Sequence, residues 1–266
     1  MSTYLDSHVH LDAAQLSPAA LVESLAKARQ AGWRGAVLAG YGPEELARAA
    51  DLCHQHGDLW YAAGLHPWWL ADHPDPDAQR AAFAAMERAV AGGQVVAVGE
   101  LGLDKTRCPE LPMAQQVRWL ERGLQLAQDN QLPAILHIVG AWQQARAAIA
   151  PFARRRLGIL HRYGGSAALV ADFEGMGLHL SLSVHHLRRA PERARAVAQA
   201  ISADRLLVET DWSGGDLSYP DAVADLAALL TQLATWRSVA RAELARQILA
   251  NTRAIYHMGL DHREQP

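Results

Sequence analysis

The sequence contains only two cysteines among its 266 residues, Cys53 and Cys108. Two cysteines placed so far apart are too few for a disulfide scaffold, so we expect a reducing, cytoplasmic location. No secretory signal is visible, because Asp6, His8 and His10 interrupt the N-terminal segment before an apolar core could form.

Long apolar runs are also missing. None approaches the roughly 18–20 residues of a membrane helix, so we expect no membrane association. The formal net charge of −3 is too small to indicate a nucleic-acid-binding protein through its overall field. It does not exclude one, because a metal site would supply positive charge locally.

Without repeats, low-complexity segments or linkers, residues 1–266 are predicted to form one domain, with residues 4–258 as its body and a short C-terminal tail.

Short apolar segments alternate with helical segments along the whole chain. We predict eight strands, at residues 4–10, 35–39, 59–63, 95–98, 134–136, 158–160, 178–183 and 206–209. Such alternation is typical of an α/β protein with a parallel sheet, and eight units favour a closed (β/α)8 barrel of the TIM type. An open, doubly wound sheet is the alternative, although no Gly-rich phosphate loop follows the first strand.

The first strand carries two histidines in alternation. His8 and His10 share one face, because side chains of a strand point the same way every two residues. Two imidazoles at this spacing can hold one divalent metal ion. The alternative is that the two histidines occur by chance in a buried strand. The other polar residues of the chain decide between a metal site and this alternative.

Four further residues with metal-binding side chains lie at or just past predicted strand ends: Glu100, His137, His161 and Asp211. In a barrel these ends meet at one face, where active sites form. Singly, each could be a hydrogen-bonded or solvated residue. Together with the two histidines of the first strand they exceed the needs of one ion. They suit two ions that share a carboxylate, about 3.5–4 Å apart.

These residues also fall within recognisable motifs, and the chain resembles the TatD-like metal-dependent hydrolases. The order and spacing match at Asp6-x-His8-x-His10, Gly64-x-His66-Pro67, Gly99-Glu100-x-Gly102-Leu103-Asp104, His137, His161 and Glu209-Thr210-Asp211. The resemblance implies an amidohydrolase-like barrel. It also implies a divalent-metal deoxyribonuclease that cuts phosphodiester bonds, often from a 3′ end, with single-stranded or frayed DNA as the expected partner.

The resemblance also implies a role for each motif residue. His8 and His10 would bind one metal together with Asp211, His137 and His161 would bind the second, and Glu100 would bridge the two. Asp211 would also act as a general base toward a water activated by both metals. Family members accept magnesium, manganese or zinc, and imidazole-rich ligation favours the softer ions over magnesium.

Other positions leave alternatives open. His66 is expected either to contact the substrate or to hydrogen-bond in a turn before Pro67. Asp104 is expected to fix the loop after Glu100, and Asp6 to accept a hydrogen bond from a ligating histidine or to face elsewhere.

The sequence departs from the family on the substrate loops. Ile138-Val139 stand where the family often has Ser-Arg, and Arg162 is a candidate replacement for that cation. Trp68, Trp69 and Trp212 are expected on loops above the site, either stacking on bases or packing as a lid. A basic segment after the seventh strand could bind phosphates or be a solvated helix face, and it contains Arg188, Arg189, Arg193 and Arg195.

Two further functions therefore remain alternatives to the nuclease. One is a small-molecule amidohydrolase, phosphotriesterase or lactonase on the same barrel. The other is a subunit of a larger nucleic-acid-handling complex.

Overall fold

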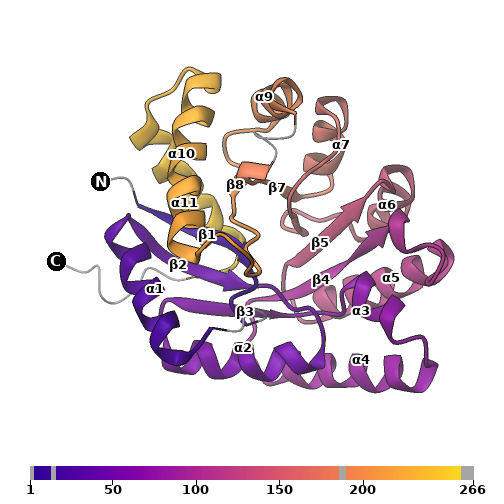
Figure 1. Ribbon diagram of the computed structural model, residues 1–266. Helices are drawn as coiled ribbons and strands as arrows, with labels where there is room; N and C mark the ends of the chain where they lie inside the picture. Colours follow the sequence, from indigo (N-terminus) through magenta and orange to yellow (C-terminus); the bar gives the residue numbers. More distant parts are fainter. Residues whose placement is uncertain (1–2, 13–15, 186–189, 259–266) are drawn as a thin grey trace.

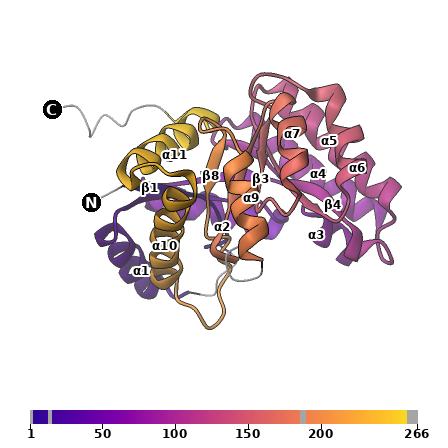
Figure 2. The ribbon, with the colours of Figure 1, turned by 90° about the horizontal axis from the view of Figure 1, so that it is seen from above.

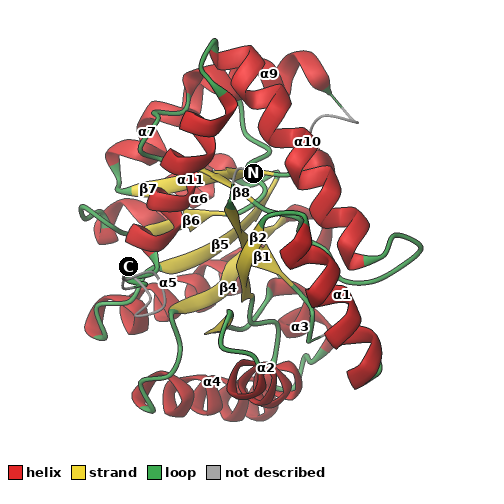
Figure 3. Cartoon of the chain, turned by 90° about the vertical axis from the view of Figure 1, so that its left-hand side faces the viewer, coloured by secondary structure: helices red, strands yellow, loops and turns green. Residues whose placement is uncertain are grey.

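The computed structural model describes residues 3–12, 16–185 and 190–258. Its sheet has eight parallel strands in sequence order. The strands are β1 (Tyr4–Val9), β2 (Trp33–Leu38), β3 (Leu59–Ala63), β4 (Ala97–Asp104), β5 (Ala134–Val139), β6 (Gly158–Leu160), β7 (Leu178–Leu182) and β8 (Leu206–Val208). The strands stand at the centre of the molecule and the helices surround them (Figures 1 and 3).

Helices follow the strands around the sheet. They are α1 (Pro18–Gln30), α2 (Pro43–Gln55), α3 (Pro67–Asp72), α4 (Pro76–Ala91), α5 (Met113–Asp129), α6 (Trp142–Ile149), α7 (Val170–Gly175), α9 (Pro191–Ala200), α10 (Tyr219–Arg237) and α11 (Arg241–Ile255). Seen from above, α1, α10 and α11 lie on one side and α5, α6 and α7 on the other (Figure 2). None of the helices in the described residues is long and apolar enough to cross a membrane.

Backbone hydrogen bonds bring the two ends of the sheet together. His10 N donates to Trp212 O at 2.9 Å, and Asp211 N donates to His8 O at 3.0 Å. These bonds join the end of β1 to the segment after β8. The result is a nearly closed (β/α)8 barrel, which confirms the predicted fold class.

Local sequence signals account for many of the helix starts. Ser17 accepts a hydrogen bond from Ala20 N, and Pro18 occupies the first helical position of α1, where its missing N–H costs nothing. Ser218 accepts a hydrogen bond from Asp221 N in the same way at the start of α10. Such caps satisfy N–H groups that the helix itself leaves unpaired.

Several predicted boundaries were wrong. Trp68 and Trp69 were expected on a loop, but both lie in α3. This helix begins after His66, whose Nδ1 accepts a hydrogen bond from Trp68 N. A helix of six residues is too short to show a 3.6-residue apolar period. The chain after residue 220 forms two helices, separated at Ser238 by a left-handed backbone with φ of 54°. Of the basic segment predicted to begin the helix at 188, residues 186–189 lie outside the described part.

The barrel interior is filled by one apolar side chain from each of six strands. These are Val37, Ala62, Ala97, Ile135, Ile159 and Leu207, and Ile255 and Tyr256 of the last helical segment pack against them. Tyr256 also donates its hydroxyl to Ser7 O at 2.7 Å. The outward-facing apolar side chains pack against the helices in a separate, larger core. The site above therefore rests on a largely apolar floor.

His179 lies at the level of this floor. It pairs with Ile159 in the β6–β7 ladder and is 5% exposed. Burial, and then the nearby Arg205, lower the pKa of His179 to about 4. Unfolding restores an ordinary histidine that takes up a proton near pH 6.5, so the unfolded chain binds more protons between the two values. Stability is therefore lost as the pH falls below 6.5.

We predict that His179→Leu removes this penalty. Relative to wild type, the free energy of unfolding of the variant should rise by about 2 kcal/mol between pH 7.5 and pH 5. Denaturant titrations of both chelator-treated proteins measure this difference without a metal contribution. Parallel pH profiles for the two proteins would contradict the assignment.

Candidate metal centre

The strands themselves bring the predicted site residues together. Within β5, Ile135 belongs to the interior floor, so His137 two residues later faces the same interior. The same phase on β6 places His161 above Ile159. The site residues come from the strands predicted for them, in the predicted order along the chain. Glu100 and His137 were expected at or just past strand ends, but both lie inside strands that are longer than predicted.

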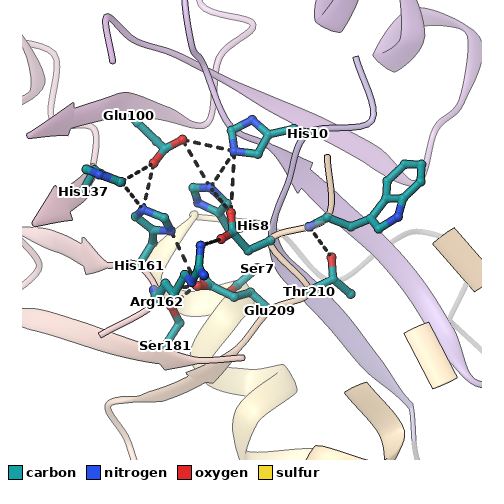
Figure 4. A network of polar contacts seen from close by, with 12 residues as sticks. Ser7, His8, His10, Glu100, His137, His161, Arg162, Ser181, Glu209 and Thr210 are labelled. Carbon is teal, nitrogen blue, oxygen red and sulfur yellow. Dashed lines mark hydrogen bonds and ion pairs between the residues drawn. The ribbon is translucent and has the colours of Figure 1, made fainter. Parts of the chain in front are cut away.

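Glu100 stands at the centre, and each of its oxygens faces a different group of imidazoles (Figure 4). Oε1 lies 3.2 Å from His10 Nε2 and 3.4 Å from His8 Nε2. Oε2 lies 2.8 Å from His161 Nε2 and 3.5 Å from His137 Nδ1. The carboxylate side chain is only 2% exposed. This split is the geometry expected of a carboxylate shared between two cation sites.

Asp211 completes the first of the two groups. Its Oδ1 lies 3.6 Å from His8 Nε2 and 3.7 Å from His10 Nε2. Its Oδ2 accepts a hydrogen bond from Arg162 Nη1 at 2.8 Å. Asp211 and Arg162 both have left-handed backbones, with φ of 54° and 44°, a conformation that non-glycine residues adopt at a cost. The strained backbones of these two residues therefore position the ion pair at the site, at a cost in conformational energy.

The charges of the centre are strongly coupled. Burial by itself raises the pKa of Glu100, but attraction to His161 and then His8 holds that pKa well below its usual range. Burial by itself lowers the pKa of His10, but the hydrogen bond and attraction to Glu100 raise it to about 9. Buried carboxylates of this kind need positive charge beside them, supplied either by protons on the imidazoles or by bound cations.

The donor set fits divalent metal ions. Among the described residues, three overlapping groups have ligand atoms within 4.8 Å of one another: His8, His10 and Asp211; His8, Glu100 and His161; and His66, Glu100 and His137. Glu100 Oε2 is buried, and its nearest polar neighbour among the described residues is the imidazole nitrogen His161 Nε2. Mixed imidazole and carboxylate ligation suits zinc, manganese and iron.

Further carboxylates lie beside the outer nitrogens of two histidines. Asp104 Oδ2 lies 3.3 Å from His137 Nε2, and Glu209 Oε1 lies 3.6 Å from His161 Nδ1. Asp104 is close enough to hydrogen-bond His137, and a partner of this kind orients a ligating imidazole and fixes its tautomer. Glu209 lies beyond hydrogen-bond distance of His161 and places negative charge beside that imidazole. Asp104 also accepts hydrogen bonds from the amide and hydroxyl of Thr106, so it does fix the loop, as expected.

Sequence reasoning missed the part played by Glu209. Its Oε2 accepts from Ser181 Oγ and its Oε1 accepts from the backbone N–H of Arg162, both at 2.5 Å. A fully buried acid at the end of an apolar strand was the available signal. Asp6, expected as a possible partner of an imidazole, instead accepts from the amide and hydroxyl of Thr210. It therefore fixes the backbone just before Asp211.

The structure shows His66 in the hydrogen-bonding role expected before Pro67, and its contact with a substrate stays a prediction. Its Nδ1 accepts the hydrogen bond that begins α3, and its Nε2 lies 3.7 Å from Glu100 Oε2. Burial, and then His137, hold the pKa of His66 well below its usual range. His66 is therefore a neutral imidazole at the edge of the centre.

A cavity of about 770 Å³ opens beside His137 and His161. Arg162 and Arg193 line it, whereas Arg195 is exposed on α9 and does not. Arg188 and Arg189 lie outside the described residues. Of the basic segment, only Arg193 is therefore placed at the site.

The three tryptophans expected above the site differ in how far they are exposed to solvent. Trp69 and Trp212 are buried, at 5% and 7% exposure, and belong to the core. Only Trp68 is open to solvent, at 40%, and it lines the cavity. Trp69 and Trp212 therefore pack, which was one of the two expectations. For Trp68, the expectation of stacking on a base stays a prediction.

Comparison with known proteins agrees with this geometry. The family model described as TatD related DNase matches residues 5–257. A Cronobacter sakazakii protein named 3′-5′ ssDNA/RNA exonuclease TatD is 35% identical over 193 residues, which cover 71% of this chain and 70% of that protein. An Escherichia coli K12 protein named uncharacterized metal-dependent hydrolase YjjV is 28% identical over 263 residues, covering 96% and 98%.

A solved structure shows the same fold. The crystal structure of YjjV, a TatD homolog from Escherichia coli K12, matches with a TM-score of 0.82 at 24% identity and covers 96% of this chain and 98% of that one. The family match spans nearly all of the barrel and includes every residue gathered around Glu100. The chain belongs to the TatD-related DNase family of metal-dependent hydrolases.

Proposed function

We propose that this protein is a two-metal nuclease that hydrolyses phosphodiester bonds from the 3′ end of single-stranded or frayed DNA. The observation that carries the proposal is the division of the Glu100 carboxylate between two imidazole groups. The names of the relatives, which include 3′-5′ ssDNA/RNA exonuclease, support the substrate and the direction. A carboxylate shared in this way would hold two ions close together, as two-metal phosphodiester hydrolysis needs.

Each residue then has a place in the reaction. His8, His10 and Asp211 would hold one divalent ion, His137 and His161 the other, and Glu100 would bind both. The two ions supply a water of lowered pKa and positive charge for the phosphate oxygens.

The chain's own polar groups do the rest. Asp211 orients the attacking water and accepts its proton, while the Arg162 ion pair fixes the Asp211 carboxylate. His66 and Arg162 contact the phosphate or the leaving oxygen. The exposed position of the Arg162 guanidinium, 39% accessible at the cavity wall, suits that role.

The first prediction concerns activity. With manganese or magnesium, the protein should shorten a 5′-labelled single-stranded DNA stepwise from its 3′ end. Glu100→Ala and Asp211→Ala should each lower the rate by at least about 100-fold, because each removes charge from the reacting centre. Gel analysis of the labelled ladder measures both the rate and the direction.

Glu110→Gln, at an exposed position in the loop before α5, is the matched control and should retain full activity. If a protein shown to hold two ions does not cleave DNA, the nuclease proposal is contradicted. That result would instead favour a small-molecule ester or amide on the same barrel, or activity that needs a protein partner.

The second prediction concerns metal content. Wild type should bind two divalent ions per chain, whereas His10→Ala and His137→Ala should each retain one. Glu100→Gln should weaken both sites by more than the roughly 10–100-fold that loss of an outer partner costs, because both ions share this carboxylate. Calorimetric titration with manganese and elemental analysis measure these stoichiometries.

Glu110→Gln again serves as the control and should bind like wild type. One ion per chain in wild type, or a Glu100→Gln effect confined to one of two sites, would contradict the bridging role.

A further inference from the structure

Trp68 is an exposed aromatic side chain that the structure holds rigidly. Its Nε1 donates to Asp104 Oδ2 at 2.6 Å, and its backbone N–H donates to His66 Nδ1 at 3.0 Å. The guanidinium of Arg107 lies over the ring, 4.6 Å from the centroid. The Trp68 indole is thus hydrogen-bonded at its nitrogen and covered on one face by Arg107, although 40% of the residue is accessible.

This ring lies directly beside the proposed metal centre. The centroids of Trp68 and His137 are 6.4 Å apart, and the two side chains share one acceptor, Asp104 Oδ2. His137 Nδ1 in turn lies 3.5 Å from Glu100 Oε2. A group stacked on Trp68 would therefore lie beside the proposed metal centre, with only the His137 imidazole between it and Glu100.

The cavity that Trp68 lines has the size and chemistry of a nucleoside site. Its volume of about 770 Å³ falls in the roughly 300–1,000 Å³ range of small-ligand pockets, not of an extended groove. Ile138 and Val139 give it an apolar wall, and Arg162 and Arg193 supply cations. The apolar wall cannot pair with a second phosphate, whereas it suits the face of a base.

We propose that Trp68 is the stacking residue for the base of the strand's terminal nucleotide, which occupies this cavity while its phosphate lies at Glu100. The inference rests on the proposed nuclease function and specifies how that site takes its substrate. An aromatic platform accepts every base, because each base has a π-face. The cavity therefore selects for an unpaired terminal base without reading its identity.

The test uses two single-stranded DNA substrates that differ only in the terminal nucleotide, which is normal in one and abasic in the other. Removing the base should raise the KM of wild type about tenfold with little change in kcat, since stacking is lost equally in the ground and transition states. Trp68→Ala should show the raised KM on the normal substrate and no further increase on the abasic one.

Trp68→Phe is the matched variant, because it keeps an aromatic ring but loses the hydrogen bond to Asp104. It should keep a KM within about threefold of wild type on the normal substrate. If Trp68→Phe behaves like Trp68→Ala, Trp68 acts through Asp104 and the stacking proposal is overturned. Equal KM values of wild type on the two substrates would overturn it as well.

A binding measurement separates this inference from the nuclease proposal. Manganese-loaded wild type should bind deoxyadenosine monophosphate about tenfold more tightly than deoxyribose 5-phosphate, and Trp68→Ala should bind both equally. Calorimetry reports this whether or not DNA is cleaved. Failure to cleave DNA refutes the nuclease, whereas equal affinity of wild type for the two ligands refutes the stacking site.

Discussion

The buried carboxylate of Glu100 is the constraint on which the rest of this site depends. An ionised acid that is 2% exposed must be surrounded by positive charge, or it would destabilise the fold. The barrel meets this demand with four imidazoles from three strands, two near each oxygen. Because the oxygens face different groups, the same residue that needs compensation also divides the site into two halves. The arrangement that compensates the charge of Glu100 is therefore also the one that the proposed two-metal chemistry would use.

Strand alternation separates this polar centre from the barrel's apolar floor. Ile135 and Ile159 fill the floor, and the next residues in phase, His137 and His161, form the centre above it. A largely apolar floor keeps the local dielectric low, which strengthens each interaction around Glu100. Behind the imidazoles, Asp104 hydrogen-bonds His137 and Glu209 places negative charge beside His161. Asp104 also holds Trp68, so the centre and the cavity wall share one hydrogen-bond network.

Much of this was predictable from the sequence. The alternation of apolar and helical segments predicted the barrel, and the two-residue period placed His8 and His10 on one face. Glu100, His137, His161 and Asp211 were predicted to converge because parallel strands end together. These inferences succeed because strand period and strand direction are local properties that the fold then repeats around the barrel.

The sequence by itself determined the barrel and which residues gather at its mouth. Only the tertiary structure decided which Glu100 oxygen faces which histidine, that Asp6 bonds to Thr210, and that Glu209 stands behind His161. It also decided that Trp68 is exposed while Trp69 and Trp212 are buried. The physical reason is that a local pattern fixes the face on which a side chain lies. Its neighbours across the barrel depend on the packing of strands distant in sequence, which no local period encodes.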